Sequence, residues 1–295
     1  MKQVDRSSRL LVFTLSGVLL GAALAGCSGN AVPPLTPSEK THTSPKQTAL
    51  PRPTSLPGTI ASVPVRKLGI DSLPLSGGQV QVRAISCWSA GDCIAGGTYS
   101  PSGHTYTNGF LTAESGGRWS TAFLVPGLDG LDVGGDAEVD WVSCSQRGFC
   151  GAGGVYDDDV NAILVSFHLN AFVVNEVRGT WYRAIPIPGL RVLNKGDSAS
   201  LEAGTCAAVG DCQVVGTFLD ANSTFQLYTD QEVSGVWQTA TQLGQFGEFD
   251  PRGSPSFSEV TCLSVSDCTA TGHFSTSGTF LAAMHDGVWS LESGG

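Results

Sequence analysis

SCWSAGDCIAGGTY, residues 86 to 99, places two cysteines six positions apart around a short turn. The same arrangement returns as SCSQRGFCGAGGVY (143–156), TCAAVGDCQVVGTF (205–218) and TCLSVSDCTATGHF (261–274). The first cysteines of successive copies are 57, 62 and 56 residues apart. A tandem repeat of this length predicts one supersecondary unit used four times.

Each copy carries a period-two pattern after its second cysteine. A small apolar residue lies two positions after that cysteine, at Ala95, Ala152, Val214 and Ala270. A glycine lies four positions after it, at Gly97, Gly154, Gly216 and Gly272. An aromatic residue lies six positions after it, at Tyr99, Tyr156, Phe218 and Phe274. The segments ahead of the first cysteine, such as VQVRAIS (80–86), alternate as well. Alternation predicts strands, so each cysteine pair is expected at the two bases of a tight turn in an antiparallel hairpin.

The rest of each unit predicts two further strands. An apolar segment with a phenylalanine follows the hairpin, at Phe110, Phe167, Phe225 and Phe280. A turn with the pattern Gly-x-Trp comes next, at Gly117-Trp119, Gly179-Trp181, Gly235-Trp237 and Gly287-Trp289. A four-stranded antiparallel unit in tandem is typical of a β-propeller blade, so the fold class is all-β and propeller-like with four blades. The segment VPVRKLGIDSLPL (63–75) either completes the last blade or belongs to a fifth, partial one.

The cysteine pairs have three readings. Disulfide staples are favoured, because hairpin partners are close enough to bridge and because the count of repeat cysteines is even: Cys87, Cys93, Cys144, Cys150, Cys206, Cys212, Cys262, Cys268. A zinc site would need four ligands together, whereas each pair lies in a different unit. A redox role would favour one special Cys-x-x-Cys pair.

The N-terminus reads as an export signal. Three basic residues precede an apolar run, Leu10 to Ala25, that is short for a membrane span. The run ends in Leu24-Ala25-Gly26-Cys27, which resembles the lipobox of bacterial lipoproteins. The resemblance implies cleavage before Cys27, acylation of that residue with chains such as palmitate, and a lipid-anchored protein on the extracytoplasmic face of the cell membrane. An ordinary signal peptide with a chance cysteine is the alternative.

The expected domain organisation has three parts: a signal peptide (1–26), a lipidated tether rich in Pro, Ser and Thr (27–57) and the repeat domain (58–295). The signal holds three of the 16 basic residues and one of the 26 acidic residues, so its loss moves the formal charge from −10 to about −12. This charge argues against nucleic acid as a partner and against electrostatic membrane binding. Membrane attachment is therefore expected through the acyl chains.

One further resemblance concerns the repeats. TAESGGRW (112–119) is similar to the Asp-box of sialidase-type propellers, with Glu114 in the place of the aspartate, while the other units keep Gly-x-Trp. The units also resemble disulfide-hairpin repeats of exported actinobacterial proteins. Both resemblances imply a propeller-like fold, and neither implies an activity.

A binding site is expected on one rim. In an up-and-down blade the disulfide turns and Gly-x-Trp turns share one end, and the more varied loops and interblade links share the other, where function usually lies. That second rim is acidic, with candidate binding residues Asp129, Asp132, Asp136, Asp157, Asp158 and Asp159. Calcium is a candidate ligand, but no Asp-x-Asp-x-Asp-Gly loop is present, so a solvated acidic face is favoured and no cofactor is expected.

Two tryptophans do not repeat, namely Trp88 and Trp141. Each is a candidate for stacking on a sugar, although packing is favoured for both. His104, His168, His273 and His285 are scattered and are expected to be surface or packing residues.

Two functions remain open. A non-enzymatic recognition or assembly module for an envelope protein or glycan is favoured, because Gly-x-Ser-x-Gly, His-Glu-x-x-His and P-loop motifs are absent from the sequence. A glycan hydrolase of propeller type is the alternative, since two carboxylates from distant loops leave no local motif.

Overall fold

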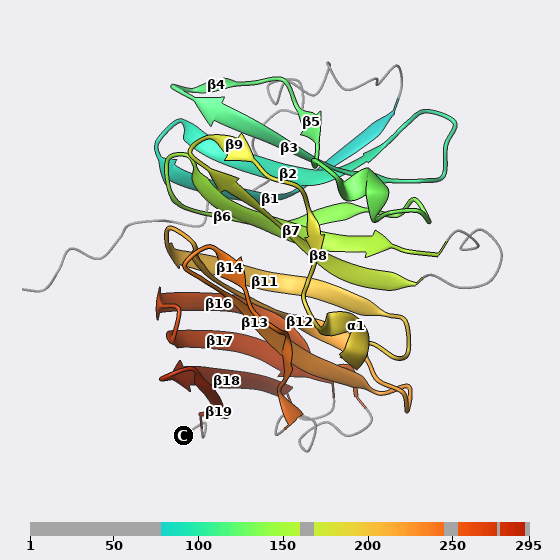
Figure 1. Cartoon of the computed structure of the whole chain (residues 1–295), viewed down its shortest axis with the longest axis vertical. Coiled ribbons are helices and arrows are strands. Elements are labelled where there is room, and N and C mark those ends of the chain that lie inside the picture. Colours follow the sequence, from blue (N-terminus) through green and yellow to red (C-terminus); the bar gives the residue numbers. More distant parts are fainter. Residues whose placement is uncertain (1–77, 160–167, 245–252, 276–277, 293–295) are drawn as a thin grey trace, which may run out of the picture. The chain divides into compact units, whose positions relative to one another are not determined.

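The computed structural model describes residues 78–159, 168–244, 253–275 and 278–292. These residues form four antiparallel sheets, one for each sequence repeat (Figure 1). Signal, Cys27, tether and the segment 63–75 lie outside the described residues, as does Phe167. The all-β, propeller-like prediction with four blades is confirmed.

Each sheet is built from strands in chain order. Sheet 1 contains β1 (Gln79–Ser89), β2 (Asp92–Ser100), β3 (Asn108–Ser115), β4 (Arg118–Trp119) and β5 (Phe123–Leu124). Sheet 2 contains β6 (Glu138–Gln146), β7 (Phe149–Asp157), β8 (Leu169–Val177), β9 (Thr180–Trp181) and β10 (Ile185–Pro186). Sheet 3 contains β11 (Ala199–Ala208), β12 (Asp211–Leu219), β13 (Phe225–Val233), β14 (Val236–Trp237) and β15 (Thr241–Gln242). Sheet 4 contains β16 (Ser256–Ser264), β17 (Asp267–Phe274), β18 (Gly278–His285) and β19 (Val288–Leu291).

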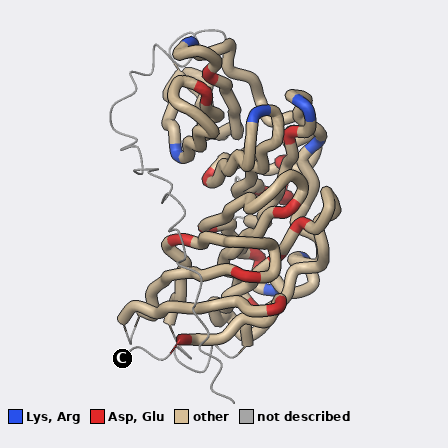
Figure 2. Tube along the Cα trace, turned by 90° about the vertical axis from the view of Figure 1, so that its left-hand side faces the viewer, with Lys and Arg blue, Asp and Glu red and all other residues tan. Residues whose placement is uncertain are grey.

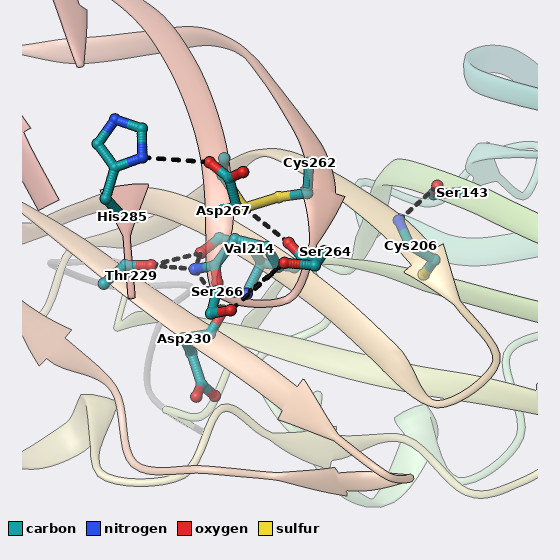
Figure 3. Close-up of a disulfide and its surroundings, with 12 residues drawn as sticks. Ser143, Cys206, Val214, Thr229, Asp230, Cys262, Ser264, Ser266, Asp267 and His285 are labelled. Carbon is teal, nitrogen blue, oxygen red and sulfur yellow. Dashed lines mark hydrogen bonds and ion pairs between the residues drawn. A yellow bond between two sulfur atoms is a disulfide. The ribbon is translucent and has the colours of Figure 1, made fainter. Parts of the chain in front are cut away.

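All four predicted disulfides are present, and each joins directly opposite residues of the first hairpin. The Cα atoms of each pair are 3.9 to 4.0 Å apart. Figure 3 shows the bridge from Cys262 in sheet 4. Each bridge therefore fixes the pairing register of its hairpin, as a staple should.

A β-bulge explains the repeated glycine. The register of the first strand slips by one residue opposite Gly97, Gly154, Gly216 and Gly272. The slip brings the partner strand's carbonyl oxygen so close that a Cβ on any of these glycines would lie 1.9 to 2.3 Å from it. Only glycine fits there, and the extra residues of the four bulges are Arg83, Asp140, Glu202 and Ser258.

Consecutive sheets pack through apolar residues and a few polar bonds. The first strands β1, β6, β11 and β16 contact one another in sequence order, whereas strands of sheets 1 and 4 share no extensive contact within the described ranges. The Ser86 hydroxyl accepts from the Cys144 N–H at 3.0 Å, and Ser143 accepts from Cys206 in the same way at 2.9 Å. These matching bonds align the first strand of each sheet with the first strand of the next sheet in the same way.

The two unrepeated tryptophans have packing roles. Trp141 is 5% exposed and belongs to the core between sheets 2 and 3. A Cβ on Gly204 would lie 2.5 Å from its ring, so the small residue makes room for the indole. Trp88 is the extra residue of a second register slip beside the disulfide, and it packs partly buried against the core between sheets 1 and 2.

The turns gather at two ends of the sheets. At one end, here called the disulfide rim, the turns at 89–92, 146–149, 208–211 and 264–267 meet those at 115–118, 177–180, 233–236 and 285–288. In every sheet a glycine N–H of the second turn donates to a carbonyl of the first, as Gly117 does to Gly91 at 2.8 Å. The other end, the link rim, carries the connections between sheets, and α1 (Leu190–Leu193) lies in one of these connections (Figure 1).

The part of the chain that the structure describes contains no helix long and apolar enough to cross a membrane.

Candidate binding site

Hydrogen bonds join four of the six acidic residues predicted on the link rim, namely Asp132, Asp136, Asp157 and Asp159. The Asp132 carboxylate accepts from the N–H groups of Asp136 and Asp157, at 2.9 and 3.0 Å. Asp158 pairs with Arg191, and Asp159 lies 3.7 Å from the His168 ring nitrogen. Most of these carboxylates thus have backbone or side-chain partners in the loops themselves, and their role in ligand binding stays a prediction.

The two described links share one architecture although their sequences differ. A Pro-Gly pair is followed by a buried leucine, Leu128 in one link and Leu190 in the other. Asn194 stands where Asp132 stands, and each side-chain oxygen accepts an N–H four residues later at 2.9 Å. The first strands of successive sheets are therefore connected by a repeated scaffold.

No metal site is evident in the described ranges, since no group of three or more His, Cys, Asp and Glu side chains is placed to hold an ion. Calcium stays a candidate ligand of the acidic rim.

The bulges bring one polar cluster to the first strands. The Arg83 guanidinium pairs with Glu138 and lies 3.0 Å from the Asp140 carboxylate. Burial raises the pKa of Asp140 to about 6, against the opposing charge of Arg83. Arg83 is the only basic residue among the four bulge positions of the described sheets.

A pocket of about 380 Å³ opens at the disulfide rim between sheets 2 and 3. We call it the rim pocket. Glu176 and Glu232 line it together with Ser145, Phe149, Asn175 and three half-cystines, Cys150, Cys206 and Cys212. Both glutamates occupy the repeat position of Glu114, opposite the second cysteine and the tryptophan of their own sheet. Sheet 4 has Met284 there.

Asn175 organises the wall of this pocket. Its Nδ2 group donates to Glu232 Oε1, and its Oδ1 accepts from the indole N–H of Trp237 at 3.3 Å. Because Asn175 comes from β8 and both partners come from sheet 3, these bonds join the two sheets. They also hold the Glu232 carboxyl and the Trp237 indole in fixed positions.

Burial changes the protonation of the acidic residues in this interface. It raises the pKa of Glu232 to about 7, although the hydrogen bond from Asn175 acts in the opposite direction. It also raises the pKa of Glu176, whose Oε2 has no hydrogen-bond partner among the described residues. Near neutral pH Glu232 can therefore exchange a proton, and in its neutral form it donates a hydrogen bond.

A larger groove of about 680 Å³ adjoins the rim pocket on the outer strands of sheets 2 and 3. We call it the outer groove. Its lining shares Asn175, Val177 and Gly235 with the rim pocket. Apolar side chains form most of the rest, and several are exposed: Tyr182 at 59%, Val236 at 61% and Ile185 at 41%. Trp237 and Arg183 complete the lining.

Local structure explains why these side chains face outward. The fourth strand of sheets 1 to 3 breaks into two short pieces after its tryptophan, and a buried alanine follows the break. In sheets 2 and 3 the N–H of that alanine donates to the carbonyl of the proline in the preceding link, as Ala184 does to Pro126 at 2.8 Å. The Arg183 side chain lies against Gly127 of the same link, and it forms no ion pair with any described residue.

Sequence reasoning missed this site, because it assigned the disulfide rim to stability alone. A signal was nevertheless present. The acidic position of the Asp-box-like turn recurs as Glu176 and Glu232, and Asn175 precedes the first of these. Aligning the repeats at the tryptophan, rather than at the cysteines, reveals that the three glutamates share one position.

No protein-family model matches this sequence, and no curated protein matches it. Among solved structures, the subtype N11 neuraminidase-like protein of A/flat-faced bat/Peru is similar, with 12% identity over 72% of this chain and 54% of that chain, and a TM-score of 0.41. A neuraminidase-like protein from A/bat/Guatemala has 13% identity over 74% and 56%, with a TM-score of 0.44. Trypanosoma rangeli sialidase has 9% identity over 72% and 38%, with a TM-score of 0.45. The chain thus spans about half the length of the first two.

Proposed function

We propose that this chain is a lipid-anchored recognition module on the extracytoplasmic face of the membrane, and that it binds an envelope glycan in the outer groove. The observation that carries the proposal is the composition of that groove. It combines an exposed tyrosine and apolar walls with an amide and an unpaired guanidinium: Tyr182, Val177, Ile185, Asn175, Arg183. Ligand sites commonly combine apolar surface with a few placed polar groups.

The chemistry of the groove suits a sugar better than a flat protein surface. A pyranose ring has an apolar face that packs on an aromatic ring, while its hydroxyls and any carboxylate accept from Asn175 and Arg183. Tyr182 offers such a ring with more than half of its surface free.

Binding of purified envelope glycans to the protein tests the proposal. Tyr182→Ala is expected to weaken binding at least ten-fold, because it removes the exposed ring. Tyr106→Ala is the matched control, since Tyr106 is an exposed tyrosine beside the link rim. Loss of binding in Asp158→Asn or Tyr106→Ala, with Tyr182→Ala unaffected, would move the site to the acidic link rim.

The anchor is tested separately. Growth with a labelled palmitate analogue is expected to label the protein, and Cys27→Ala is expected to remove the label and release the protein from the membrane fraction. Retention of an unlabelled Cys27→Ala protein in the membrane would contradict lipid anchoring.

A glycan hydrolase is the second candidate, and the rim pocket favours it. Glu176 and Glu232 both line this pocket, and burial raises the pKa of each, as a general acid requires. Turnover of a panel of chromogenic glycosides, lost in Glu232→Gln, would support hydrolysis. No turnover across the panel would leave the recognition module.

A further inference from the structure

The disulfide rim exposes apolar side chains at the tips of its turns on sheets 3 and 4. Val209, Val236, Leu263 and Val288 are 42, 61, 87 and 70% exposed. Single exposed aliphatic residues are ordinary, but here four lie on the turns of one rim. No structural need explains them, because Ala90, Arg118, Trp88 and Thr180 occupy equivalent turn positions in sheets 1 and 2.

The net charge of the turns on this rim differs between the two halves of the chain, although sheet 1 also carries Asp92, at the repeat position of Asp211 and Asp267. Arg118, Arg147 and Arg178 are exposed on the turns of sheets 1 and 2, and none forms an ion pair with a described residue. Between Ser198 and Glu292 the described residues include no Lys or Arg, while the rim there carries Asp211, Asp267 and Asp286. In Figure 2 red positions stand alone toward the C-terminal end, whereas red and blue positions are mixed in the N-terminal sheets.

Contacts show that the three arginines belong to neighbouring turns. The turns of Arg147 and Arg178 touch, since the Gly179 N–H donates to the Gly148 carbonyl at 3.2 Å. Asp92, which feels the charge of Arg147, accepts from the N–H of Gly116 at 3.0 Å, two residues before Arg118. The basic half of the rim is thus continuous across sheets 1 and 2.

We propose that two copies of this chain associate through their disulfide rims about a two-fold axis. A two-fold axis reverses the order of the sheets, so the basic half of one copy meets the acidic, apolar half of the other, twice. Arginine stems cover exposed aliphatic side chains while their guanidinium groups pair with carboxylates. The rim is therefore complementary to itself in both charge and apolar surface.

This inference goes beyond the glycan proposal and does not rest on it. The two sites meet at Val236, which lines the outer groove as well as the rim. A second copy would therefore border the ligand groove.

The repeats supply substitutions that the turn already accepts. Arg178 and Asp286 occupy the same turn position, with φ of 55° and 51°. Arg178→Asp and Asp286→Arg therefore exchange charge without new backbone strain. The basic half is reversed by Arg147→Glu with Arg178→Asp, and the acidic half by Asp267→Lys with Asp286→Arg.

Pairing is measured on the full chain, produced in one cell with two different C-terminal tags, solubilised in mild detergent and purified through one tag. The wild-type chain is expected to carry the second tag with it, as an assembly of two copies by native mass. Each reversed variant is expected to lose at least ten-fold of its pairing with itself. The two reversed variants mixed together are expected to pair again, because each reversed half then faces a half of opposite net charge.

Lys195→Glu on the link rim is the control and is expected to pair normally. Equal melting temperatures of all variants exclude misfolding as the cause of any loss. Failure of the wild-type chain to pair, assemblies larger than two copies, or no recovery in the mixture would overturn the proposal. Loss of glycan binding in Tyr182→Ala with pairing intact would separate the two sites.

Discussion

A Cβ placed on Gly97 would lie 1.9 Å from the carbonyl oxygen of Gln81 on the neighbouring strand. The same approach recurs at Gly154, Gly216 and Gly272, each opposite a bulge in the first strand of its sheet. The glycine of the repeat is therefore required by the backbone of its neighbour, and at Gly272 also by the Phe280 ring, 2.2 Å from the added Cβ. It also fixes which residue becomes the extra one of the bulge.

Gly216→Ala tests this requirement. The added methyl group must displace the Ser200 carbonyl, 2.0 Å away, so we expect a loss of about 1–3 kcal/mol in the free energy of unfolding. Denaturant unfolding followed by tryptophan fluorescence measures the loss. Gly244→Ala is the control, because no described atom lies within 4 Å of the place its methyl group would take, and it should change stability little. Equal stability of the two variants would contradict the bulge argument.

The hairpin disulfides give a second prediction. Each closes a loop with a sequence separation of only 6, so removal of one is expected to cost about 2 kcal/mol in the loop-entropy model. Cys206→Ser with Cys212→Ser should lower the free energy of unfolding by that amount without changing the fold, as circular dichroism would show. Peptide mapping without reduction should find each cysteine bridged to its near neighbour. Bridges between different repeats would contradict the structure.

Much of this fold could be predicted from the repeat. The period-two pattern predicted the strands, and the constant cysteine spacing predicted all four staples. The aromatic position of the third strand was harder to predict. The residues opposite the repeated glycine are Phe110, Phe172, Tyr228 and Phe280. The predicted Phe167 and Phe225 are not among them, because the loops before these strands differ in length between the repeats.

The candidate site was hidden for a different reason. Asn175, Glu232 and Trp237 meet only when sheets 2 and 3 pack, and the spacing within one repeat carries no information on partners in the next. The acidic link rim stood out in the sequence because its aspartates are close along the chain. Asp132 nevertheless accepts one N–H from Asp136 of its own link and one from Asp157 at the end of β7, a contact that spacing along the chain does not reveal.

Asn175→Leu tests the link between the two sheets. The substitution removes the donor to Glu232 and the acceptor for the Trp237 indole, and it leaves a buried carboxyl without that partner. We expect a loss of about 1–3 kcal/mol in the free energy of unfolding. The pKa of Glu232 should rise above its value of about 7, because the hydrogen bond that lowers it is gone. Titration of the side chain by NMR measures the change, and Asn222→Leu, in an exposed turn, is the control.

Asp230 gives the pH dependence. It is 2% exposed and lies on β13 two residues from Tyr228 and Glu232, which share its face of the strand. The Thr229 hydroxyl donates to the Val214 carbonyl, and the Asp230 carboxyl projects away from this bond (Figure 3). Oδ1 accepts from the Gln231 N–H, whereas Oδ2 has no partner among the described residues. The equivalent residues of the other sheets are Thr112, Val174 and Ala282, so a carboxyl is not required here by the fold.

Burial raises the pKa of Asp230 to about 8, from 3.8 for an ordinary aspartate. Between these two values the unfolded chain has lost a proton that the folded chain keeps, so the free energy of unfolding falls as pH rises, by up to about 1.4 kcal/mol per pH unit. Below about pH 4 both states are protonated and above about pH 8 both are ionised, so this dependence ends at either side. Asp230→Asn should reduce the fall of stability between pH 4 and 8, and part of the fall should stay because the pKa values of Glu232 and Asp140 are raised as well. The exposed Glu259→Gln should leave the curve unchanged. Denaturant unfolding at pH 5 and pH 8 measures this dependence. A wild-type protein that is more stable at pH 8 would contradict the prediction, because Asp230 would then have to be ionised and paired in the folded state.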